Sequence, residues 1–317
     1  MCECGVGAPT WSERDRRYQR RRLDAARVLA VLDERRGSAL REVIPSTTGE
    51  PLLWDGLDVL VDRCSQAGLA LNLTTNGTWP GRGAARWAAR LLPVASDVKV
   101  SWNGSTPATA AAIMSGIDLS KAIADLRAVI AHRDAIAAWT DQRATISFQV
   151  TAQEANVAEL GDVVRLAAAL GVDRVKVNHL QVRFPSLAQL SLRRSRLSIA
   201  RWNHAVAQMR AAADEARTPD GRRVKIVNAV ELPPDPADRL PAGPCPFLGQ
   251  EAWVLVDGRY APCPHPAAVR RELGDFGTID DRPLGAFWSG EPLRALAAAY
   301  EEHPVCRECA FRRPGGA

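Results

Sequence analysis

Four cysteines near the C-terminal end are the feature that most constrains what this chain can fold into. Twelve residues separate Cys245 from Gly258, four separate Gly258 from Cys263, and forty-two separate Cys263 from a closing Cys306-Arg-Glu-Cys309 pair. Thiolates at this close spacing can hold one metal centre, because the turn between them points both sulfurs the same way. Gly258 stands in Val-Asp-Gly-Arg-Tyr, a hairpin signal that returns the chain to present Cys263. The pattern therefore predicts two half-sites joined on one metal centre.

The spacing alone leaves two kinds of metal centre open. Zinc sites commonly use two C-x2-C pairs, and this segment has only one. An iron–sulfur cluster also takes four thiolates and tolerates wide gaps between them. Unliganded structural cysteines would have no reason for paired spacing. Disulfides are disfavoured because no apolar signal segment marks the chain as secreted.

The bulk composition is that of a soluble globular protein of one or two domains. The chain has 317 residues, of which 46% are hydrophobic and 24% charged. It contains no 18-residue apolar run. The net charge is +5, but the basic residues are not interleaved with aromatic ones as a stacking surface requires. We therefore expect a cytoplasmic protein that binds neither nucleic acid nor a membrane.

Strand-like and helix-like segments alternate before the cysteines, with crossovers long enough for parallel pairing. This order predicts an α/β fold with a parallel sheet. Six prolines between Glu231 and Pro246 indicate a linker, so we expect domains at 1–230 and 231–317. The predicted strands are 40–44, 69–74, 97–102, 144–151, 174–179 and 222–230, and the predicted helices are 12–36, 56–67, 84–92, 107–133 with a break near Gly116, 157–170 and 196–217.

Polar residues follow or end the predicted strands. Ligands of parallel α/β sheets gather at the carboxyl ends of the strands. The candidate site residues at these ends are Thr48, Gly49, Glu50, Asn76, Ser101, Gln149 and Asn178.

In this order the loops resemble the partial barrel of radical S-adenosylmethionine enzymes. Thr48-Gly49-Glu50-Pro51 is similar to their Gly-Glu-Pro motif, and Val98-Lys99-Val100-Ser101 to a later strand. The cysteine segment resembles their auxiliary-cluster domain, called SPASM, in the shorter form called twitch, since Gly315 stands where SPASM would have a further cysteine. The resemblance implies a partial (β/α)6 TIM-like barrel missing its first strand, with a small C-terminal iron–sulfur domain.

The resemblance also implies cofactors. S-adenosylmethionine would contact the seven strand-end residues, with Gly49 allowing close backbone approach and Glu50 pairing with the methionine ammonium. An auxiliary 4Fe–4S cluster would be bound by Cys245, Cys263, Cys306 and Cys309, while no catalytic residue is identified.

One family motif is incomplete in this sequence. The C-x3-C-x2-C loop that binds the catalytic cluster should precede Gly49-Glu50-Pro51, and only Met1-Cys2 matches its end. We interpret the chain as starting inside that loop, with Cys2 as the third ligand. We therefore expect the chain as given not to cleave S-adenosylmethionine.

The function implied by the resemblance is hydrogen abstraction by a 5′-deoxyadenosyl radical. The outcome would be dehydrogenation or modification of a peptide or natural product, by a radical oxidoreductase or maturase. The partners would be a small-molecule or peptide substrate and an electron donor such as flavodoxin or ferredoxin. The alternative is a degenerate, non-enzymatic binding or scaffold protein with a zinc-stabilised C-terminal domain.

Overall fold

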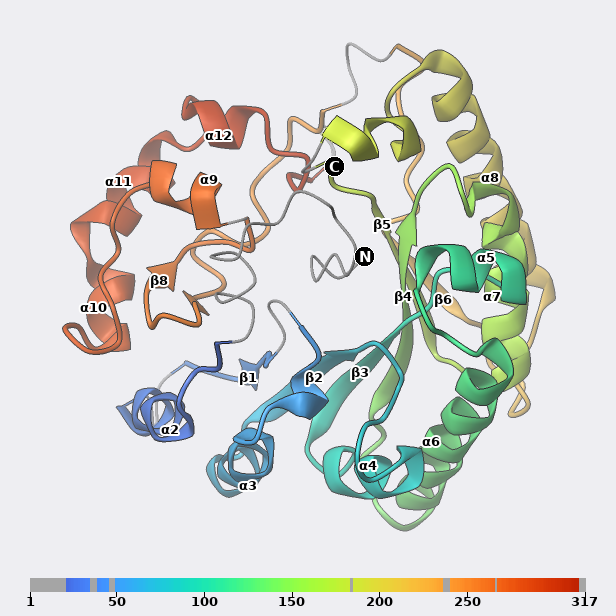
Figure 1. Ribbon diagram of the computed structural model, residues 1–317, viewed down its shortest axis with the longest axis horizontal. Coiled ribbons are helices and arrows are strands. Elements are labelled where there is room, and N and C mark those ends of the chain that lie inside the picture. The colour runs from blue at the N-terminus through green and yellow to red at the C-terminus, as the bar shows by residue number, and fades with distance from the viewer. Residues whose placement is uncertain are drawn as a thin grey trace. The chain divides into compact units, whose positions relative to one another are not determined.

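The computed structural model describes residues 21–34, 39–45, 49–182, 185–235, 240–265 and 267–313. Apart from the gaps, these residues divide into two compact units (Figure 1). The first unit contains residues 41–235, and the second combines residues 21–40 with residues 240–313. The predicted boundary at residue 230 stays a prediction, but the grouping of an N-terminal segment with the C-terminal one was not foreseen.

The first unit is built on a parallel sheet. The described residues form six strands in the order β1-β2-β3-β4-β5-β6, and every neighbouring pair is parallel. This arrangement confirms the predicted α/β fold of a partial barrel. The strands are β1 (Glu42–Val43), β2 (Ala70–Thr75), β3 (Ala95–Ser101), β4 (Thr145–Ala152), β5 (Arg174–His179) and β6 (Lys225–Val227).

The helices of this unit lie along the outer side of the curved sheet (Figure 1). The predicted break near Gly116 is confirmed, because Asp118 begins a new helix by accepting a hydrogen bond from the backbone N of Lys121. The last predicted strand is shorter than expected, since Asn228 has a φ of 68°. The helical elements are η1 (Pro51–Leu53), α3 (Leu57–Ala67), α4 (Ala84–Leu91), α5 (Pro107–Ile113), α6 (Leu119–Trp139), η2 (Val157–Glu159), α7 (Leu160–Leu170), η3 (Pro185–Leu190) and α8 (Arg196–Glu215).

The two faces of this sheet differ sharply in chemistry. Apolar side chains at alternate positions are almost completely buried; Leu73, Val98, Phe148 and Val175 are all at most 1% exposed. A parallel sheet covered on both faces normally consists of continuous apolar runs. Here the intervening positions carry polar side chains, so the face away from the buried apolar one is polar. This polar face consists of Asn72, Thr74, Asp97, Lys99, Ser101, Ser147, Gln149, Thr151, Arg174, Lys176 and Asn178.

The half of the polar face nearest the strand starts is closed by a network around Asp97. Its carboxylate accepts a hydrogen bond from Ser147 Oγ at 2.7 Å and forms an ion pair with Arg174. Lys99 Nζ lies 3.4 Å from Asp97 Oδ2 and donates to Asn72. Asp97 and Lys99 are only 4% and 8% exposed. Burial lowers the pKa of Lys99, and Asp97 opposes that shift. The network thus joins β2, β3, β4 and β5 through buried charge.

The second unit is small and packs around its own core. The helix 12–36 is described only in part, as α2 (Ala25–Glu34), whose Val31 joins that core with Tyr260 and Phe287. Arg27 Nε donates to Asp280 Oδ1 at 3.0 Å, and the backbone N of Leu284 donates to Glu34. The remaining elements are β7 (Trp253–Val254), β8 (Tyr260–Ala261), α9 (Ala267–Glu272), α10 (Leu284–Ser289), α11 (Glu291–Ala299) and α12 (Pro304–Arg307).

The predicted hairpin at Gly258 is confirmed. Strands β7 and β8 pair antiparallel, and Gly258 has a φ of 84° between them. A Cβ at this position would stand 2.3 Å from Arg27 Nη2. The positive φ favours glycine at this position, and the hairpin leads the chain to Cys263. No helix in the described part of the chain is both long and apolar enough to cross a bilayer.

The Asp97 network yields a stability prediction. Asp97→Asn keeps the side-chain shape but leaves Lys99 and Arg174 without their carboxylate, so it should destabilise the chain by about 3 to 5 kcal/mol. Asp162→Asn is the matched control, because its carboxylate is 62% exposed in a pair with Arg165 and should change stability by less than about 0.5 kcal/mol. Urea denaturation followed by circular dichroism measures both; equal losses would contradict the network's role.

Candidate functional site

Glu50 links the loop after β1 to the end of β2. Its carboxylate accepts hydrogen bonds from the backbone N of Asn76 at 2.7 Å, from Thr75 Oγ1 at 2.8 Å and from the backbone N of Leu52 at 3.1 Å. The last of these caps η1. Burial raises the pKa of Glu50 above its ordinary 4.5, and the three hydrogen bonds oppose the rise. All three contacts come from this chain, so the carboxylate positions the site whether or not it also meets a ligand ammonium.

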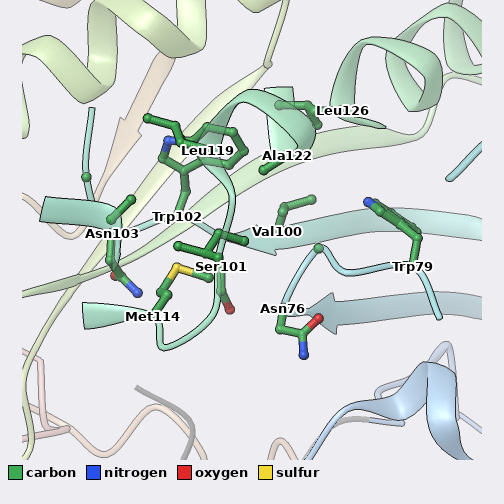
Figure 2. A pocket seen from close by; sticks show the side chains of 14 residues that line it. Asn76, Trp79, Val100, Ser101, Trp102, Asn103, Met114, Leu119, Ala122 and Leu126 are labelled. Carbon is green, nitrogen blue, oxygen red and sulfur yellow. The ribbon is translucent and has the colours of Figure 1, made fainter. Parts of the chain in front are cut away.

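Asn76 and Ser101 line one pocket at the ends of β2 and β3 (Figure 2). Asn76 Oδ1 accepts from Thr78, and no described residue accepts a hydrogen bond from its Nδ2. The wall beside them is mostly apolar and comes from Trp79, Met114 and α6. The turn after β2 has a glycine at position 77, because a Cβ there would lie only 2.9 Å from Val100 Cγ1.

Gln149 and Lys176 continue the row that Ser101 begins. In the sheet register, Ser101 is opposite Gln149, and Gln149 is opposite Lys176. Lys176 is half-buried, and among the described residues it has no hydrogen bond or ion pair. Lys99 is close enough that the charge of Lys176 contributes to lowering the pKa of Lys99. This end of the polar face therefore carries the positive charge of Lys176, which no carboxylate of the described residues pairs with.

Asn178 and His179 end the row at β5. Asn178 is exposed, and its Oδ1 accepts from Asn228 Nδ2 at 2.9 Å. The ring of His179 packs on Trp202 with centroids 4.4 Å apart. Burial, with the charge of Arg193, lowers the pKa of His179 to about 3, so its ring is neutral at physiological pH. The structure thus brings Glu50, Asn76, Ser101 and Gln149 together in one row. Asn178 lies at the exposed end of that row.

Lys176 was missed as a candidate site residue in the sequence, and Lys99 was missed as part of the network that supports the site. The signal that could have identified them is the strict alternation of β3 to β5, in which every second residue is polar although the strands are parallel. Two predicted site residues, Cys2 and Thr48, lie outside the described residues. Cys64 is buried in α3, away from the strand ends, as expected of a packed cysteine.

The second unit brings the four predicted ligands together. Cys245, Cys263, Cys306 and Cys309 all line one pocket. Cys306 lies in α12, and the backbone N of Cys309 donates to the carbonyl of Cys306 at 3.2 Å, forming the turn that the C-x2-C spacing predicted. The other lining residues are Phe247, Leu248, Pro262, His265, Leu273, Leu296, Tyr300 and Arg312.

Two polar side chains stand among these mostly apolar walls. His265 Nε2 lies 3.2 Å from Cys309 Sγ. The Arg312 side chain is 8% exposed, and its Nε donates to Gly243 O at 2.6 Å. The charge of Arg312 acts to lower the pKa values of Cys306 and Cys309, and a buried cation here offsets part of the negative charge of a thiolate-bound centre.

The cysteine pocket favours neutral thiols while it contains only protein. Burial raises the pKa of Cys263 and of Cys306 to about 11, and also raises that of Cys309. A bound metal replaces those protons with positive charge. Among the residues that the structure describes, no three His, Cys, Asp or Glu side chains are close enough to hold a single metal ion. The shared pocket is therefore the geometric basis of this site, and its four-sulfur donor set fits an iron–sulfur cluster, whose thiolates bind separate irons.

Known proteins resemble both units of this chain. The SPASM family, described as an iron-sulfur cluster-binding domain, matches residues 245–310. The family name is that of the longer form, and the shorter twitch form stays a prediction. A PqqA peptide cyclase from Streptomyces rochei is 26% identical over 288 residues, which cover 85% of this chain and 72% of that protein.

Solved structures of Streptococcus suis SuiB share the fold. SuiB bound to the precursor peptide SuiA matches with a TM-score of 0.60 at 12% identity, over 90% of this chain and 63% of SuiB. SuiB bound to S-adenosylmethionine matches with a TM-score of 0.61 at 12% identity, over 91% of this chain and 65% of SuiB. The chain therefore spans slightly less than two thirds of the length of SuiB.

His179 makes stability depend on pH in a defined direction. Its pKa is lowered from 6.5 to about 3, so its contribution is complete above pH 6.5 and is lost as the pH falls toward 3. The expected slope is about 1.4 kcal/mol per pH unit. His179→Phe keeps a ring against Trp202 and should remove this slope in urea denaturation between pH 7 and 4. His204→Phe, an exposed position on α8, is the control; a parental slope in both variants would contradict the assignment.

Proposed function

We propose that this chain, which belongs to the radical S-adenosylmethionine enzymes with a C-terminal SPASM domain, modifies a peptide with the help of an auxiliary 4Fe–4S cluster. The observation that carries this proposal is the single pocket lined by Cys245, Cys263, Cys306 and Cys309, inside the segment that the SPASM family matches. Four protein thiolates fill every iron of a cubane, which favours electron transfer over direct binding of substrate.

The polar ends of the strands supply the second cofactor site. With one electron from a reduced catalytic cluster, bound S-adenosylmethionine would be split into methionine and a 5′-deoxyadenosyl radical, and that radical would remove a hydrogen atom from the substrate. Asn76 offers an amide nitrogen, Nδ2, that no described residue accepts from, and Ser101 and Gln149 stand opposite each other in the sheet. Glu50 holds the backbone of Asn76 in place. Lys176, next in the row, offers positive charge to a carboxylate of the cofactor.

A peptide is the substrate class best supported. The relative from Streptomyces rochei is named a peptide cyclase, and one SuiB structure contains a precursor peptide. The alternating polar face gives room for polar contacts in the middle of the sheet, where a closed barrel would pack branched apolar side chains. A small-molecule dehydrogenation has no comparable support among these relatives.

The cluster site is tested by metal content. Anaerobic reconstitution with iron and sulfide should load about four irons per chain in the C-terminal site. Replacing Cys306 and Cys309 together by serine should remove those irons and their visible absorption. Cys64→Ser is the control, because Cys64 is also a free cysteine but is buried in α3, outside the cysteine pocket. Tightly bound zinc with no iron uptake would instead support a zinc-stabilised scaffold protein.

The cofactor site is tested through Lys176. A charge-assisted hydrogen bond contributes roughly 1.5–3 kcal/mol, so Lys176→Met should weaken S-adenosylmethionine binding by about tenfold to a hundredfold. Lys225→Met is the control, since Lys225 lies on the adjacent strand with an exposed side chain. Calorimetry on the reconstituted full-length protein measures both affinities. Unchanged binding in Lys176→Met would remove this residue from the cofactor site.

A further inference from the structure

We propose that His265 sets the reduction potential of the auxiliary cluster by donating a hydrogen bond to the sulfur of Cys309. This inference rests on the cluster site proposed above. His265 lines the same pocket as the four cysteines, but it is not proposed as a ligand of the cluster. His265 is thus a positioning and tuning residue rather than a ligand.

The contact is direct and the ring is held in place. Nε2 of His265 lies 3.2 Å from Sγ of Cys309, well inside hydrogen-bonding range for sulfur. The His265 ring packs edge-on against Phe311, with centroids 5.2 Å apart and planes at 75°. Phe311 in turn meets Phe247 edge-on at 5.8 Å. These packed rings fix the direction in which the imidazole nitrogen points.

The chemistry of a bound thiolate decides which atom donates. A sulfur bonded to iron has no proton, so it can only accept, and Nε2 must carry the hydrogen. A donor at the sulfur withdraws electron density from the cluster and stabilises its reduced state. Hydrogen bonds to cluster sulfurs are among the features that set the potentials of such centres. His265 therefore raises the potential of the auxiliary cluster.

The four sulfurs are not equivalent in this respect. Cys309 Sγ also accepts from the backbone N of Phe311 at 3.4 Å. A backbone hydrogen bond from His265 also reaches Cys263, so Cys309 is not the only sulfur with a donor. The imidazole of His265 is a side-chain donor, so a substitution can remove it while these backbone donors remain.

The test compares three variants of the reconstituted full-length protein. His265→Phe removes the donor and keeps a ring to pack against Phe311. His265→Gln retains an N–H donor on a shorter side chain. His204→Phe is the control, because His204 is exposed on α8 in the other unit. Iron content is measured first, and the midpoint potential of the cluster is then measured by a redox titration followed by electron paramagnetic resonance.

The expected result is parental iron content in all three variants, with a lower midpoint potential in His265→Phe, a partial return in His265→Gln and no change in His204→Phe. A parental potential in an iron-loaded His265→Phe overturns the inference. If that variant fails to load iron, pulsed resonance on the reduced parent labelled with 15N-histidine decides: a histidine nitrogen coupling supports the contact, and its absence overturns it. A parent that takes up no iron overturns the cluster site itself.

Discussion

A buried carboxylate organises the first unit. Asp97 lies on β3, where it pairs with Lys99 of the same strand, and its ion pair with Arg174 reaches across β4 to β5. Such charges can stay buried only while they remain paired, because each carries a large desolvation cost. The network therefore fixes the relative positions of β3, β4 and β5 from inside, while the apolar face fixes them from the helix side. This arrangement therefore also sets the alignment of Ser101, Gln149 and Lys176 on neighbouring strands.

The division of the polar face has a functional meaning. Near the strand starts, the charged side chains of the network pair with one another, so they require no ligand. Near the strand ends, Asn76 and Lys176 have donors that no described residue satisfies. A sheet whose interior were packed with apolar side chains would be more stable but could hold no polar ligand. The same alternation that supports the fold at one end therefore leaves a site at the other.

Much of this could be predicted from the sequence, and the exceptions have physical reasons. The order of strands, the break at Gly116 and the hairpin at Gly258 depend on local signals, and all three are present. Glu50 was expected to meet a ligand, but its bonds to Thr75 and Asn76 depend on two strands meeting, which spacing along the chain does not reveal. Lys176 was overlooked because a lysine in a strand is ordinary until the register sets it beside Gln149. The contact between His265 and Cys309 joins residues 44 positions apart.

The pairing of α2 with the C-terminal residues makes the second unit discontinuous. Arg27 and Asp280 are 253 positions apart, so α2 is synthesised long before its partners. Until they emerge, Val31 has no core to enter and remains in water. Contacts over such distances close large loops, and this slows their formation. The cysteine pocket is consequently assembled from residues as far apart as Cys245 and Arg312, on a unit that also needs α2, so it cannot be complete before all of them have been made.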